Sequence, residues 1–100
     1  MRASTSSPDR EPPLLPWLSR LVRGVLRLPD DQPVHDRTLV GLGMESLQAI
    51  ALQYQLMDQV GVDVPIDDLL GSRDVAGLAA LIAGDLDPEV VEATARELSA

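Results

Sequence analysis

Residues 42–56 read LGMESLQAIALQYQL, and within them an aperiodic stretch gives way at Ser46 to helical spacing. Apolar side chains at positions i, i+3, i+4 and i+7 give a helix a single apolar face. The spacing therefore predicts a helix from Ser46 to about Val60, ended by Gly61. Its apolar face is expected to consist of Leu47, Ile50, Ala51, Tyr54 and Met57, and its polar side chains are mostly the neutral Gln48, Gln53, Gln55 and Gln59.

Helical spacing also occurs on both sides of this helix. One helix is predicted to begin at Pro16, which suits a first turn, and to stop at Pro29. Residues 66–70 have room for one or two turns, and Ser72 can cap a further helix that closes at Gly84. The chain is therefore predicted to be all-α, a small bundle of three main helices and a short third helix. The apolar stripes of its first and last core helices are Leu18, Leu21, Val22, Val25 and Leu26, and Val75, Leu78, Ala79 and Ile82.

Three segments lie outside these helices. Residues 29–45 run for seventeen positions without a period, and loops of that length are usually either disordered or functional. Residues 1–15 are rich in Ser, Pro and charge and are expected to form a disordered tail or linker. Residues 85–100 are expected to form a peripheral helix or linker, which leaves residues 16–84 as the domain. Apolar side chains favour an ordered loop fastened to the core (Val34, Leu39, Val40, Leu42) and give the last segment a narrow stripe (Val91, Ala95, Leu98).

Composition and charge exclude several classes of function. The absence of cysteine excludes a disulfide framework, a thiolate metal site and a cysteine nucleophile. Residues 36–100 hold three of the eight arginines and twelve of the sixteen acidic residues, a balance of −9 that would repel a nucleic-acid backbone. This acidity suits attraction to basic protein surfaces, or merely a soluble surface. No apolar run approaches the roughly 20 residues that span a bilayer, and no signal sequence is visible, so a cytoplasmic protein is expected.

The side chains available for catalysis are few. His35 is the only histidine, and as a base it would act from a loop beside Pro33, so an exposed loop histidine is the better interpretation. The adjacent Asp67 and Asp68 have no further ligands at a useful spacing, which favours a solvated turn over a metal site. We therefore expect no catalytic residues and no metal, and the chain is not predicted to be an enzyme.

Ser46 stands at the junction of the long loop and the helix, and this position admits two interpretations. A serine there is commonly an N-cap. Alternatively it is a site that another molecule approaches, because Gly43 leaves the backbone accessible, and Met44 and Leu47 are apolar side chains on a segment expected to be exposed. The helix start also offers free N–H groups and the positive end of the helix dipole, which favour an attached phosphate diester.

The stretch LGMESLQAIALQYQL resembles the phosphopantetheine-attachment motif of acyl carrier proteins, particularly those of polyketide synthases. That motif is close to L-G-x-D-S-L-x-A-hydrophobic, and Glu45 stands where the family most often has Asp. The similarity continues through VGVDVPIDDLLGSRDVAGLAALI and covers roughly residues 16–84. It implies the family's four-helix bundle, with a long loop between the first two helices.

By this resemblance, Ser46 matches the serine that receives 4′-phosphopantetheine from coenzyme A through a separate phosphopantetheinyl transferase. The arm ends in a thiol, so a chain without cysteine can hold an acyl group as a thioester. Leu47 matches the leucine that touches the arm and the partner enzymes, and Met44 matches a variable position on the same surface. The second helix carries only Asp58, where many carriers have several acids. Further contacts with the arm or with partners are expected at Gly43, Glu45, Asp67 and Asp68.

The resemblance thus implies a carrier of intermediates in polyketide, antibiotic or related specialised-metabolite biosynthesis. Besides the transferase, the expected partners are ketosynthase, acyltransferase or adenylation/ligase-type loading enzymes, with no nucleic acid and no membrane, and the protein is expected to be a monomer. An aminoacyl or peptidyl carrier of a nonribosomal or hybrid system is the alternative, including a discrete carrier for an amino-acid-derived starter. Glu45 favours the polyketide type, because peptidyl carriers more often have a histidine there. The other alternative is a helical interaction adaptor without a prosthetic group, in which Ser46 is only a cap.

Overall fold

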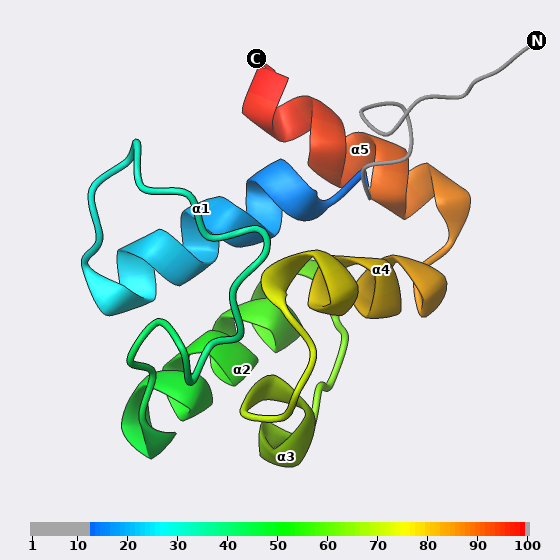
Figure 1. Cartoon of the computed structure of the whole chain (residues 1–100). Helices are drawn as coiled ribbons and strands as arrows, with labels where there is room; N and C mark the ends of the chain where they lie inside the picture. The colour runs from blue at the N-terminus through cyan, green and yellow to red at the C-terminus, as the bar shows by residue number, and fades with distance from the viewer. Residues whose placement is uncertain (1–12, 100) are drawn as a thin grey trace, which may run out of the picture.

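The computed structural model describes residues 13–99, and five α-helices make up most of this part of the chain (Figure 1). α1 lies against α2, α4 and α5, and α3 lies against α2, so α1 is the helix around which the others assemble. The predicted all-α bundle with a short third helix is confirmed. The helices are α1 (Leu15–Leu26), α2 (Ser46–Val60), α3 (Ile66–Leu69), α4 (Val75–Gly84) and α5 (Pro88–Ser99).

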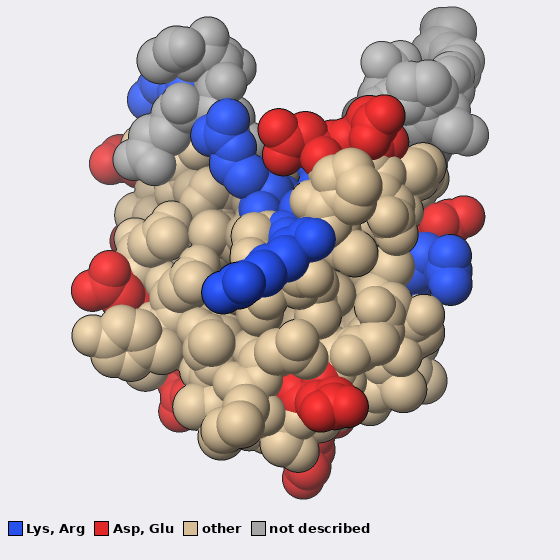
Figure 2. Space-filling view, turned by 90° about the vertical axis from the view of Figure 1, so that its left-hand side faces the viewer, with Lys and Arg blue, Asp and Glu red and all other residues tan. Residues whose placement is uncertain are grey.

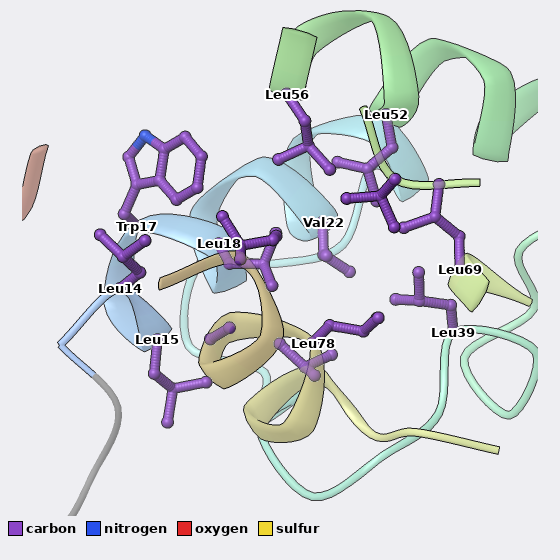
Figure 3. Close-up of a cluster of buried hydrophobic side chains, with 14 of the residues drawn as sticks. Leu14, Leu15, Trp17, Leu18, Val22, Leu39, Leu52, Leu56, Leu69 and Leu78 are labelled. Carbon is purple, nitrogen blue, oxygen red and sulfur yellow. The ribbon is translucent and has the colours of Figure 1, made fainter. Parts of the chain in front are cut away.

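The core is a mainly aliphatic cluster that includes Trp17 and to which α1 to α4 and the loop between α1 and α2 all contribute (Figure 3). Complete burial of one leucine, isoleucine or valine side chain stabilises a fold by about 1.5–3 kcal/mol. The predicted stripe of α4 is buried along its whole length, which confirms the direction in which that helix faces. The largest fully buried side chains are Leu14, Leu18 and Val22, then Val34 and Leu39 in the loop, and Leu52, Leu56, Leu69, Val75, Leu78 and Ile82.

The start of α1 extends the domain beyond its predicted boundary. α1 begins at Leu15, one residue before the predicted start, with Pro16 in its first turn. Leu14 and Leu15 are buried in the core, so they belong to the bundle rather than to the tail assigned from the sequence. Trp17 is also buried, and its Nε1–H donates to Gln59 Oε1 of α2 at 3.3 Å. The predicted tail over residues 1–12 lies outside the described residues.

α1 ends before the proline that was predicted to stop it. The last helical residue is Leu26, because Arg27 adopts a left-handed conformation with φ 57°. The Arg27 N–H donates to Gly24 O at 3.3 Å and the Leu28 N–H donates to Arg23 O at 2.8 Å. These bonds close the last turn as a Schellman-type cap, with arginine where glycine is usual.

α2 has the predicted bounds, but its predicted apolar face does not point into the core. The buried residues are Ala49, Leu52 and Leu56, which form a second set with helical spacing. The set that runs from Leu47 to Met57 is exposed instead. Periodicity finds both apolar sets but does not say which of them faces the core, and the set named from the spacing is the exposed one.

The loop between α1 and α2 is ordered, as predicted, because it is fastened to the core and to α4. Val34 and Leu39 are fully buried, whereas Val40 is exposed and fastens nothing. The first two N–H groups of α4 donate to the carbonyls of Arg37 and His35, at 3.0 and 2.9 Å. This pairing holds the loop across the start of α4.

The N-cap of α4 is Asp74, whose Oδ1 accepts from the Gly77 N–H at 2.8 Å. The prediction that Ser72 caps this helix is wrong, because the carboxylate directly before the first helical residue takes the role. α5 begins at Pro88, as expected for a first-turn proline, and lies against α1 with Thr94 buried. The side chain of Leu98 and the whole of residue 100 lie outside the described part.

Candidate functional site

Ser46 is the first residue of α2, and it is exposed. A tight turn over residues 39–44 precedes it. In this turn the Gly43 N–H donates to Val40 O at 2.9 Å, and the Met44 N–H donates to Leu39 O at 3.0 Å. Gly43 has φ +96°, a conformation that side chains rarely adopt, so this turn requires glycine. The loop therefore places the serine at the N-terminal end of a helix, in contact with solvent.

The N-cap of α2 is Glu45, not Ser46. Glu45 is extended, with φ −111° and ψ 175°, and its carbonyl accepts from the Ala49 N–H at 2.9 Å. The Glu45 N–H in turn donates to Gln48 Oε1 at 2.8 Å, which is the side-chain contact of a capping box. The interpretation of Ser46 as a helix cap is therefore wrong, and the fold has no capping role for its hydroxyl.

The two apolar neighbours of Ser46 point in opposite directions. Met44 is only 4% exposed and belongs to the core cluster, so the expectation that it lines the outer surface is wrong. Leu47 is 81% exposed. Gly43 and Glu45 are exposed as well. The side chain of Met44 thus fixes the start of α2 to the core, whereas the side chain of Leu47 lies beside Ser46 in contact with solvent.

The surroundings of Ser46 fit a phosphodiester. The first N–H groups of an α-helix lack partners within the helix, and the helix dipole makes this end positive, so a negative group is stabilised there. A Cβ built on Gly43 would meet no atom within 4 Å, so the space beside the turn is open. Ser46 would hold a phosphopantetheinyl group, and the backbone of the first turn of α2 would face its phosphate.

The two acidic residues that were expected to contact the arm or a partner, Asp67 and Asp68, lie in α3 and not in α2. Asp67 and Asp68 are exposed in α3, which packs against α2, and the hydrogen bonds of the described residues do not join either carboxylate to Ser46. Within residues 13–99, no three His, Cys, Asp or Glu side chains are grouped so that they could hold a metal ion. The arrangement supplies acidic charge beside α2.

His35 lies in the loop between α1 and α2 and faces residues of α1. It is exposed, and with Ser19 and Arg23 it lines a hollow of about 280 Å³ between α1 and the loop. Among the hydrogen bonds of the described residues, none joins the His35 ring to the Ser19 hydroxyl.

The sequence analysis missed the outer surface of α2 as a feature of this site. Its large apolar side chains are 46–81% exposed, and they begin at the residue next to Ser46. One signal was present in the positions of the glutamines, because Gln48, Gln53 and Gln55 are half-buried and so lie nearer the core than the apolar set does. We call this surface the α2 outer face; it consists of Leu47, Ile50, Ala51, Tyr54 and Met57.

Comparison with known proteins agrees with this geometry. The family model described as "Phosphopantetheine attachment site" matches residues 16–82, which run from the first turn of α1 into α4. Searches of curated proteins and of solved structures found no match. No helix in the described part is both long and apolar enough to cross a membrane. Since the matched residues cover more than half of the chain, it belongs to the phosphopantetheine attachment site family, as a non-catalytic carrier whose implied prosthetic group is 4′-phosphopantetheine.

Proposed function

We propose that Ser46 carries the 4′-phosphopantetheine group, and that the protein presents acyl intermediates to the enzymes of polyketide biosynthesis. The observation that supports Ser46 is its exposed position at the start of α2, where Glu45 and Gln48 already provide the cap. A hydroxyl that the fold does not use is free to be modified. The adaptor alternative needs Ser46 as a cap, and it loses its support for that reason.

Attachment requires little from the carrier itself. The Ser46 oxygen attacks the phosphorus next to the pantetheine of coenzyme A, its proton passes to a base of the transferase, and adenosine 3′,5′-bisphosphate leaves. The fold contributes an accessible hydroxyl and a positive helix end near the phosphate. Once attached, the group supplies a thiol that holds an acyl chain as a thioester. Tethering in this way raises the effective concentration of that chain at each partner's active site.

The polyketide assignment is supported by Glu45, an acidic residue directly before the serine. The aminoacyl or peptidyl carrier is the second candidate, and it is supported by α2, in which Asp58 is the only charged residue. In the first case acyltransferases and ketosynthases are the loading and consuming partners. In the second case adenylation or ligase-type enzymes load the arm.

The test of attachment is intact mass before and after incubation with coenzyme A, Mg²⁺ and a broad-specificity phosphopantetheinyl transferase. We expect the wild-type chain to gain one phosphopantetheine and Ser46→Ala to gain none. Loading of the Ser46→Ala variant would move the site elsewhere, and failure of the folded wild-type chain to load would overturn the proposal. Challenge of the loaded carrier with malonyl-transferring and amino-acid-adenylating enzymes then separates the two pathway types.

A further inference from the structure

We propose that the hollow between α1 and the loop after it binds a small carboxylate. The guanidinium of Arg23 pairs with the carboxylate, and the apolar part of the ligand lies on Leu15 and Pro16. None of the residues that line the hollow belongs to α2, so the site is separate from the proposed attachment at Ser46. The ligand is held without a covalent bond, and the inference therefore does not depend on whether Ser46 is modified.

The hollow is lined by a row of residues along α1 and by one residue of the loop. Leu15, Ser19 and Arg23 follow one another at intervals of four, so they lie on the same side of the helix. His35 adds a side chain from the loop. The hollow measures about 280 Å³, just below the range of about 300–1,000 Å³ that is usual for sites of drug-sized molecules. Its size and its mixed polar and apolar lining therefore suit a small organic ligand.

Arg23 is held in place by a hydrogen bond that leaves the end of its side chain available. Its Nε–H donates to Gln32 O at 2.8 Å, which joins α1 to the loop. Within residues 13–99 no other hydrogen bond uses this guanidinium, so its two terminal nitrogens can donate to a ligand. A guanidinium donates two parallel bonds to the two oxygens of a carboxylate, and such charge-assisted bonds are roughly twice as strong as neutral ones. The loop is fixed as well, because the Ala76 N–H of α4 donates to His35 O at 2.9 Å.

Ser19 provides a buried polar group beside Arg23. It is only 5% exposed, and it lines the hollow. The hydrogen bonds of the described part of the chain do not include one to the Ser19 hydroxyl. Burial of a hydroxyl without a hydrogen bond costs free energy, and buried hydroxyls in folded proteins normally have a partner. A carboxylate oxygen in the hollow would accept a hydrogen bond from this hydroxyl, which the fold itself leaves without an acceptor.

The charges around the hollow favour an anion with a single charge. The chain has a formal charge of −8, but on the face that is on the left of Figure 1 arginines lie across the upper and middle parts (Figure 2). A second hollow, of about 340 Å³, adjoins the first, since Pro16 and Arg23 line both. Its other lining residues are Arg20 and Asp30. The two arginines and the one carboxylate leave one positive charge, which a carboxylate ligand neutralises and a phosphate dianion would exceed.

The test titrates the full chain with small molecules and follows the backbone amides by heteronuclear NMR. The probe is butyrate, whose propyl chain can lie on Leu15 and Pro16; butyramide is the matched neutral molecule, and inorganic phosphate is the competing anion. We expect butyrate to shift the amide signals of Ser19, Arg23 and His35 with a Kd on the order of 1 mM, because a ligand of so few atoms gains little binding energy. Butyramide should give no saturable shift, and phosphate should bind more weakly than butyrate, because it exceeds the available positive charge.

Two variants and a matched control locate the carboxylate. Arg23→Gln should weaken butyrate binding at least about tenfold, because the charge-assisted bonds are lost. Ser19→Ala leaves the bond from Arg23 to Gln32 O intact and should weaken binding about threefold, because one hydrogen bond to the ligand is lost. Arg20→Gln removes an equal charge from the same helix, and it should bind within about twofold of wild type, because Arg20 is exposed and does not line the first hollow.

Several results would overturn the proposal. These are a folded wild-type chain without a saturable butyrate shift, phosphate that binds more tightly than butyrate, and equal weakening by Arg23→Gln and Arg20→Gln. All variants should keep the helical circular dichroism of the wild type. If Arg23→Gln does not fold, Ser19→Ala decides, and wild-type affinity in that variant would overturn the proposal. Ser46→Ala should bind butyrate as the wild type does, so failure of attachment and failure of this site are observed separately.

Discussion

α1 and α2 pack against each other, yet they distribute their side chains in opposite ways. α1 buries Trp17, Leu18 and Val22, and it turns Arg20 to solvent, which is the usual arrangement of a surface helix. α2 buries a narrow set of three residues and turns its wider apolar set outward. The difference shows that helical periodicity detects an apolar face without saying which side the core occupies. For α2, packing against α1 and α3 decides which side of the helix faces the core.

The largest expected effect tests the two apolar sets of α2 directly. Leu52→Ala should lower the free energy of unfolding by about 3 kcal/mol, because it removes buried methyl groups and leaves a cavity. Tyr54→Ala, two residues further along the same helix, should change it by no more than about 0.5 kcal/mol. Urea denaturation followed by circular dichroism measures both. Equal losses for the two variants would contradict the assigned orientation of α2.

The ends of the same two helices provide the second comparison. Both stop at a residue with positive φ, Arg27 at 57° after α1 and Gly61 at 73° after α2. Glycine adopts this conformation without the cost that a Cβ adds, which is about 1–2 kcal/mol. Arg27→Gly should therefore raise the free energy of unfolding by about 1 kcal/mol, and Gly61→Ala should lower it by a similar amount. Thermal unfolding of the two variants checks both signs, and a loss of stability in Arg27→Gly would contradict the left-handed cap.

The glutamines of α2 provide the third comparison. Gln53→Ala should cost about 1 kcal/mol, because the Val64 carbonyl loses the amide that donates to it at 2.8 Å. Gln55→Ala is the matched control, since Gln55 is also half-buried and on the same helix. Chemical denaturation distinguishes the two. If both variants are as stable as wild type, the hydrogen bond from Gln53 to the Val64 carbonyl does not help to hold α2 in place.

Much of the fold could be predicted because local signals and packing agree. The bounds of α2, the buried stripe of α4 and the ordered loop follow from spacing, glycines and apolar anchors in the sequence. The N-caps were harder, because Ser72 and Asp74 are both suitable residue types before α4, and because Glu45 caps α2 although serine is the residue type that favours this position. The conformation of the backbone decides which of two neighbouring candidates becomes the N-cap. Met44 was expected on the outer surface and is buried, and the spacing of α2 left the direction of its apolar set open, because the direction of a side chain depends on contacts that are distant in sequence.

A small change in stability is expected at Ser46, the residue with the largest expected role. Because Glu45 caps α2, Ser46→Ala should change the free energy of unfolding by less than about 0.5 kcal/mol, whereas loss of a true N-cap costs about 1 kcal/mol. Gln48→Ala, which removes the acceptor for the Glu45 N–H, should cost more than Ser46→Ala in the same denaturation experiment. A loss of 1 kcal/mol or more in Ser46→Ala would return the serine to a capping role. The expected pair of results, unchanged stability and no loading, would mean that the fold builds its cap from the neighbouring residues and keeps the hydroxyl of Ser46 for modification.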